Sequence, residues 1–79
     1  MRPLLELVMK PKDSPARITE VDLKNRQVTM VTTINGEERT YFLVPGQMSP
    51  TINLIKPGMT GTMTWMTGSS YSLPFFKAD

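Results

Sequence analysis

Turn-forming residues recur about every eight to twelve positions along this chain, and that spacing limits what it can fold into. Lys24-Asn25, Asn35-Gly36, Pro45-Gly46, Pro57-Gly58 and Gly68-Ser69 separate short apolar or alternating segments. Strands of five or six residues fit between such turns, whereas helices usually need longer uninterrupted segments. The pattern predicts an all-β fold with one short helix.

The Asn35-Gly36 pair predicts a tight hairpin, because both residues tolerate a positive φ. Strands are expected over residues 27–34 and 38–44, and the length of the turn fixes which side chains share a face. The face richer in large apolar side chains is expected in the core; it comprises Val28, Met30, Thr32, Ile34, Arg39, Tyr41 and Leu43. Phe42 is then expected on the outer face, with Val31 and Val44, either as a contact residue or covered by an N-terminal strand.

Three further elements complete the expected domain. Residues 17–23 predict a strand with one break in alternation, as a β-bulge produces. Ser49 and Pro50 favour the start of a short helix whose Ile52, Ile55 and Leu54 would close one end of a barrel. Residues 59–66 predict a strand that directs Met59, Gly61, Met63 and Trp65 inward, with Gly61 at a bend and Trp65 buried.

The last strand pair depends on the loop that follows Thr67. A two-residue loop at Gly68-Ser69 would place Trp65 opposite Ser72, whereas a three-residue loop at 68–70 would place it opposite Leu73. The second arrangement gives one apolar face and is the one expected. It directs Tyr71, Leu73 and Phe75 inward, while Pro74 marks an edge strand.

The chain is expected to form one small domain over residues 1–79. Leu4–Met9 predicts an extra N-terminal strand, and Pro11 and Pro15 indicate an exposed connector before the barrel. The expected division is therefore 1–15 for this strand and connector and 16–77 for the barrel.

The composition argues against most enzyme classes. None of the 79 residues is cysteine or histidine, so thiolate nucleophiles, imidazole bases and the common zinc ligands are missing. Glu20 and Asp22 are expected to be solvated charges, and Ser69 and Ser70 to be turn formers. We expect no enzymatic activity and no cofactor. The apolar runs are too short for a signal peptide or membrane span, which predicts a cytoplasmic protein without membrane association.

The segment 59–71 contains three methionines and the only tryptophan, which raises the question of a copper site. Cu(I) requires two or three converging sulfurs. Met63 and Met66 are expected on opposite faces, and Met59 lies roughly 13 Å from Met63 along an extended strand. Core packing is therefore the expected role, and no metal site is predicted.

The layout resembles that of a small five-stranded OB-fold barrel, with an SH3-like barrel as the alternative. The resemblance lies in "ARITEVDLKNRQVTMVTTINGEERTYFLV" followed by "INLIKPGMTGTMTW". The phrases "I..VD..NR.VTM" and "IKPGM" are also similar to the periplasmic copper-carrying barrels, which bind Cu(I) through His, Met and Trp. That ligand set does not carry over, because this chain has no histidine.

The OB-fold resemblance implies a binding surface on the outer face of the second and third barrel strands. Phe42 would stack on a base, Thr29 and Thr40 would form hydrogen bonds, and nearby cations would contact phosphates; these are Lys24, Arg26 and Arg39. The sequence thus favours a non-enzymatic module that binds single-stranded DNA or RNA.

A protein–protein interaction or assembly module is the alternative function. Such a module would dock by strand addition or through a hydrophobic patch within a larger complex, of the kind that viruses and plasmids encode. Binding through phosphates weakens steeply with salt, whereas burial of Phe42 and Val44 against a protein does not. The identity of the partner and the oligomeric state are open at this point.

Overall fold

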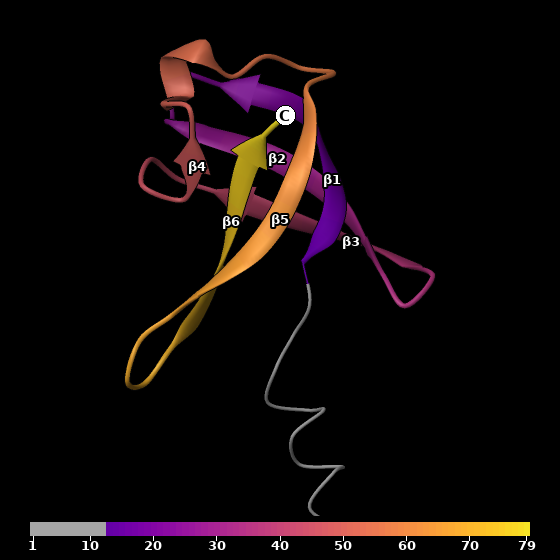
Figure 1. Ribbon diagram of the computed structural model, residues 1–79. Coiled ribbons are helices and arrows are strands. Elements are labelled where there is room, and N and C mark those ends of the chain that lie inside the picture. Colours follow the sequence, from indigo (N-terminus) through magenta and orange to yellow (C-terminus); the bar gives the residue numbers. More distant parts are fainter. Residues whose placement is uncertain (1–12) are drawn as a thin grey trace, which may run out of the picture.

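The computed structural model describes residues 13–79, which form an all-β domain (Figure 1). The predicted class, nearly all strand with one short helical turn, is confirmed. The expected strand Leu4–Met9 lies outside the described residues. The elements are β1 (Ser14–Asp22), β2 (Gln27–Ile34), β3 (Glu37–Leu43), β4 (Met48–Ser49), the 3-10 helix η1 (Ile52–Leu54), β5 (Thr60–Thr67) and β6 (Ser72–Ala78).

The strands form one curled sheet in the order β3-β2-β1-β5-β6-β4. Neighbouring strands are antiparallel except for the short parallel pair of β4 and β6. In the described part of the chain, the ladder of strands ends at β3 on one side and at β4 on the other. The sheet is therefore not closed into the barrel that the sequence predicted, although β3 curls behind β5 and β6 (Figure 1).

The β2–β3 hairpin has the predicted turn and faces. Asn35 and Gly36 both have positive φ, 53° and 81°, and form a two-residue turn. Val28 lies opposite Leu43, and Met30 lies opposite Tyr41. Four side chains of the predicted inner face are at most 1% exposed: Val28, Met30, Thr32 and Leu43. Local turn chemistry is sufficient to fix this register.

Strand β1 contains the predicted bulge but begins earlier than expected. The register between β1 and β2 shifts between Ile18 and Glu20. Ser14 and Pro15 belong to the strand, so the prediction of a connector that reaches Pro15 is wrong at these two residues. Pro15 has no N–H to donate, yet its carbonyl accepts a hydrogen bond from the Thr32 hydroxyl at 2.8 Å.

The core lies on the concave side of the sheet. It comprises Ala16, Ile18, Val28, Met30, Leu43, Met48, Ile52, Ile55, Met63 and Phe76. Met30 and Met63 are fully buried among these side chains, which confirms the core-packing role predicted for Met63. Met59 is half-buried against the core, so the same prediction is confirmed for it in part.

Helix η1 is the short turn predicted, but it begins later than expected. Ser49, the predicted cap residue, belongs to β4 and pairs with β6, so Thr51 takes the N-cap position of the helix. Ile52 and Ile55 are each 3% exposed, as expected, whereas Leu54 is 61% exposed. A single helical turn directs only some of its side chains to the core, and Leu54 projects from the opposite side.

The register of the β5–β6 hairpin differs by one residue from the prediction. The connection spans four residues, Gly68 to Tyr71, and places Trp65 opposite Pro74 and Met63 opposite Phe76. A one-residue shift turns every side chain of a strand to the other face. Phe76 is consequently buried, whereas Tyr71 and Leu73 are exposed and Phe75 lies on the outer face.

Two backbone hydrogen bonds accompany this longer connection. The Gly68 N–H donates to the Tyr71 carbonyl at 2.9 Å, and the Tyr71 ring occupies the space where any Cβ at position 68 would lie. The Phe76 N–H donates to the Gln47 carbonyl at 2.9 Å, which fixes the buried end of β6.

Candidate binding surface on β2 and β3

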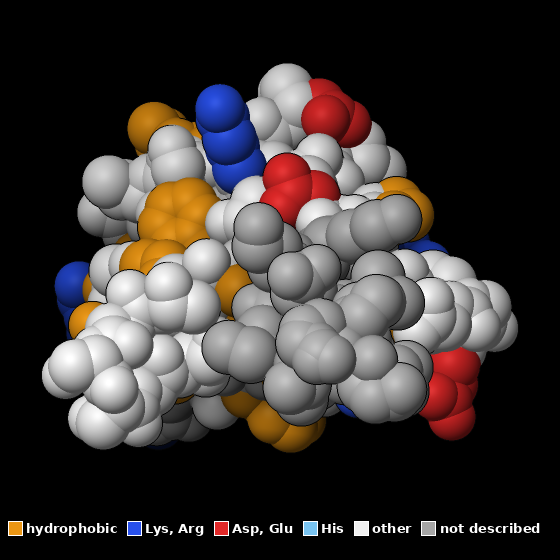
Figure 2. All heavy atoms as spheres, turned by 60° about the horizontal axis from the view of Figure 1, so that its bottom comes forward, with side chains coloured by type: hydrophobic (Ala, Val, Ile, Leu, Met, Phe, Trp, Pro, Cys, Tyr) orange, Lys and Arg blue, Asp and Glu red, His pale blue; other side chains and the backbone are white. Residues whose placement is uncertain are grey.

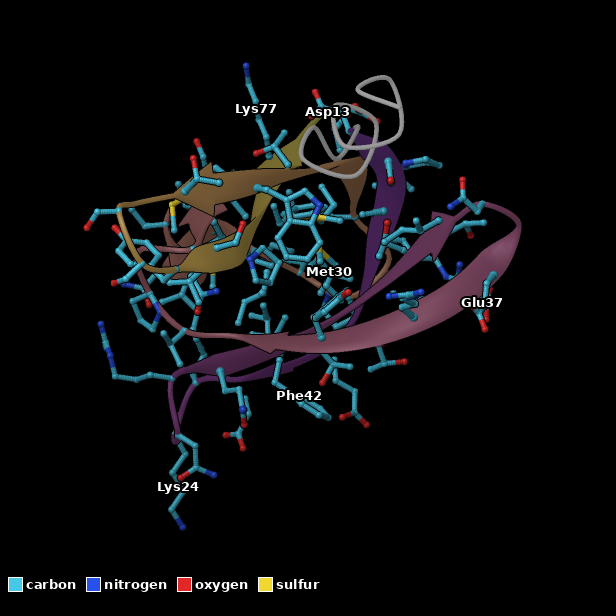
Figure 3. The ribbon with its side chains drawn as sticks, turned by 90° about the horizontal axis from the view of Figure 1, so that it is seen from below. Asp13, Lys24, Met30, Glu37, Phe42 and Lys77 are labelled. Atoms are coloured by element: carbon cyan, nitrogen blue, oxygen red, sulfur yellow. The ribbon has the colours of Figure 1, made fainter. Side chains whose placement is uncertain are left out.

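Phe42 projects outward from β3, as its position in the hairpin predicted. Figure 3 shows Met30 within the curl of the strands and Phe42 on the outside of β3. The Phe42 side chain is 62% exposed, and Val44, which follows β3, is 48% exposed. An exposed phenylalanine near the end of a strand and an exposed valine just after it form a small apolar patch. We call Phe42, Val44 and Thr29 the Phe42 surface.

Strand pairing places Thr29 and Thr40 beside Phe42. Thr29 lies opposite Phe42, and Thr40 is two residues from it on the same face of β3, opposite Val31. These are three of the six side chains that the sequence predicted for binding. They come together on one face because β2 and β3 are antiparallel and in the predicted register.

Lys24 and Arg26 lie at one end of this surface, in the turn between β1 and β2. Arg26 has a φ of 53°, and the Asp22 carboxylate holds the turn by accepting hydrogen bonds from the Asn25 side chain at 2.8 Å and its backbone N–H at 3.1 Å. These bonds lower the pKa of Asp22. Figure 3 shows Lys24 and Phe42 projecting from the same side of the molecule.

Arg39 does not belong to the Phe42 surface. It lies opposite Thr32 on the face of β3 that carries Tyr41, and its guanidinium pairs with Glu37 at 3.4 Å. A hydrogen bond with the Tyr41 side chain and the interaction with Glu37 raise the pKa of Arg39. A ligand on the Phe42 surface would therefore not meet this cation.

Carboxylates flank the Phe42 surface; the hairpin parity placed Glu38 on this face, whereas the position of Glu20 was not indicated by the sequence pattern. Glu20 lies opposite Thr29 on β1, so the three strands present the row Phe42, Thr29 and Glu20. Glu38 lies two residues from Thr40 and forms an ion pair with Arg17 at 3.7 Å. The charges around Phe42 are thus mixed rather than uniformly basic.

A shallow depression of about 310 Å³ opens on the outer side of β1, beside the same surface. Val31, Arg17 and Asp79 are among the residues that line it, and it is open to solvent. The described residues hold no cluster of three or more His, Asp or Glu side chains that could bind a metal. Within residues 13–79, no helix has the length and hydropathy needed to cross a bilayer.

A second exposed surface was missed by the sequence reasoning. Met66 lies opposite Leu73, and Thr64 lies opposite Phe75, on the outer face of the β5–β6 hairpin. The shifted register of β6 creates this apolar face. Its signal in the sequence is a segment without any charged residue, from 57 to 76.

Comparison with known proteins does not assign a function to either surface. No family model matches the chain, and neither a similar curated protein nor a similar solved structure was found. The functional argument therefore rests on the chemistry of the exposed residues.

Proposed function

We propose that this chain is a non-enzymatic module that binds a protein partner through the Phe42 surface. The exposure of the Phe42 side chain, 62% on the outer face of a strand, carries the proposal. Large aromatic side chains at the centre of an interface commonly contribute most of its binding free energy. Val44 enlarges the apolar contact beside it.

The position of β3 supports docking by an extended peptide. Among the described strands, β3 has a hydrogen-bonded neighbour, β2, on one side only. Such an edge offers backbone N–H and C=O groups to an added strand. Glu37 and Glu38 at the start of β3 disfavour pairing there, so the partner would align with the part of β3 around Phe42.

Single-stranded nucleic acid is the second candidate ligand. Phe42 offers one stacking ring, Lys24 and Arg26 offer cations, and the OB-like succession of strands around a short helix supports such a role. Glu20, Asp22 and Glu38 lie on or beside the same face, however, and carboxylates repel phosphates. These charges favour a protein partner over nucleic acid.

Two binding measurements separate the candidates. Peptides selected from a phage-displayed random library on the folded protein should bind Phe42→Ala about tenfold more weakly or worse, with little dependence on salt. Tyr71→Ala, which changes an aromatic residue of similar exposure away from β3, should leave their affinity unchanged.

Fluorescent oligo-dT and oligo-rU provide the opposing test. We expect no saturable binding of either oligonucleotide at low salt. Tight binding that falls steeply with added salt and is lost in Phe42→Ala would instead establish the nucleic-acid function.

A further inference from the structure

We propose that two copies of this chain associate as a weak symmetric dimer through the outer face of the β5–β6 hairpin. This hairpin face consists of Met66, Leu73, Phe75 and Tyr71. Leu73 and Tyr71 are 42% and 57% exposed, and Met66 and Phe75 are half-buried. Met66 and Leu73 lie directly opposite each other, so the apolar side chains form one continuous stripe.

The absence of charge on this hairpin favours a second copy as the occupant. No residue from 57 to 76 is charged, and Lys77, the first charged residue after this segment, lies on the same face. A symmetric interface brings each side chain close to its own counterpart, so a charged surface opposes itself whereas an uncharged apolar surface is self-complementary. The Phe42 surface, flanked by Glu20, lacks this property.

The two-fold arrangement also places Lys77 favourably. With the axis beside Leu73, the stripe Tyr71, Leu73 and Phe75 of one copy runs antiparallel to that of the other. Phe75 then contacts the Tyr71 ring of the second copy, and the two Lys77 side chains lie at opposite ends of the contact. No like charges meet at its centre.

β4 pairs with β6 only at Phe76 and Lys77, and the part of β6 before Phe76 favours contact through side chains over addition of a strand. Pro74 has no N–H, and its carbonyl already accepts a hydrogen bond from the Gln47 side chain at 3.0 Å. A proline on an outer strand edge blocks further pairing. The side-chain face of the hairpin therefore remains as the contact surface.

The hairpin is also accessible to a second copy. It projects beyond the body of the sheet toward the lower left of Figure 1. Figure 2 shows hydrophobic side chains on that same left side, whereas acidic side chains lie toward the top and right. Lys77 and Phe42 project from opposite sides of the molecule, so this dimer leaves the Phe42 surface open (Figure 3).

The size of the contact sets its strength. Four side chains of this size, each already partly covered, would bury on the order of 300–400 Å² from each copy. The total lies below the roughly 1,200 Å² at which stable interfaces begin. The dimer is therefore concentration-dependent.

Sedimentation velocity from low micromolar to millimolar protein tests the proposal. The wild type should shift reversibly from monomer to dimer, with little change on addition of salt. Leu73→Lys should weaken association about tenfold or more, because it places two like charges beside the axis. Phe42→Lys, the matched change on the opposite side, should leave the dimerisation constant unchanged.

Circular dichroism should show that both variants are folded, and NMR spectra on dilution should shift at Met66, Leu73 and Phe75. A wild type that stays monomeric at millimolar concentration would overturn the proposal. So would a dimer that survives Leu73→Lys and dissociates in Phe42→Lys. The first result leaves the peptide-binding test of the Phe42 surface unaffected, whereas the second would place another copy of the chain on that surface and would have to be separated from peptide binding by working below the dimerisation constant.

Discussion

The rings of Tyr41 and Trp65 meet nearly at right angles, with centroids 5.9 Å apart and an interplanar angle of 88°. Tyr41 lies on β3 and Trp65 on β5, and β2 and β1 separate these strands in the sheet. The contact therefore spans the concave side of the curl. Both side chains are half-buried, so the prediction of a buried Trp65 is correct in direction and too strong in degree.

Trp65→Ala should lower the free energy of unfolding by about 2–3 kcal/mol, less than full burial would imply. Chemical denaturation gives this value. A double-mutant cycle with Tyr41→Ala should give a coupling of about 1 kcal/mol, as edge-to-face aromatic pairs do. Additive effects of the two substitutions would contradict the contact.

Leu43→Ala and Phe42→Ala should differ strongly in stability although the residues are adjacent. Leu43 is fully buried and Phe42 is 62% exposed. We expect Leu43→Ala to cost about 3 kcal/mol and Phe42→Ala about 0.5 kcal/mol or less. Thermal denaturation of both variants measures the difference, and equal losses would show that Phe42 is covered.

Thr32→Val should destabilise the fold while hardly changing the shape of the side chain. Thr32 is 1% exposed, and its hydroxyl donates to the Pro15 carbonyl at 2.8 Å. Loss of this donor leaves the carbonyl without that hydrogen bond, at a cost of about 1–3 kcal/mol. The control is Thr33→Val at an exposed position of the same strand, which should be nearly neutral in urea denaturation.

Gly61→Ala should be among the most damaging small substitutions. A Cβ at this position would overlap the Lys77 carbonyl and lie 2.9 Å from the Ala78 Cα, both in the backbone of β6. Separating β5 from β6 should cost about 3 kcal/mol or more. At Gly36 the space is open and only the positive φ is strained, so Gly36→Ala should cost about 1 kcal/mol in the same assay.

Asp22 should titrate below the usual range of an aspartate, because Asn25 donates two hydrogen bonds to its carboxylate. Its contribution to stability is present above the pKa of the unfolded state and is lost as pH falls through the lower folded-state pKa. NMR titration of the carboxyl carbon measures the value. Asn25→Ala should raise the pKa of Asp22, whereas Asn35→Gly, in the other hairpin turn, should not move it.

The sequence determined the β2–β3 hairpin and with it the outward direction of Phe42. Asn35-Gly36 allows one compact turn, and the alternation of strands then assigns every side chain to a face. The positions of Thr29 and Thr40 beside Phe42 follow from the same local chemistry. Their role in binding stays a prediction.

Only the tertiary structure decided the register of β6 and the position of Glu20 in one row with Thr29 and Phe42. The loop between β5 and β6 could accommodate several lengths, and the burial of Phe76 and its backbone bond to Gln47 select one. The bulge after Ile18 places Glu20, rather than Thr19, opposite Thr29. Both outcomes depend on contacts between segments far apart in the chain, whose free energies outweigh the small differences among local alternatives.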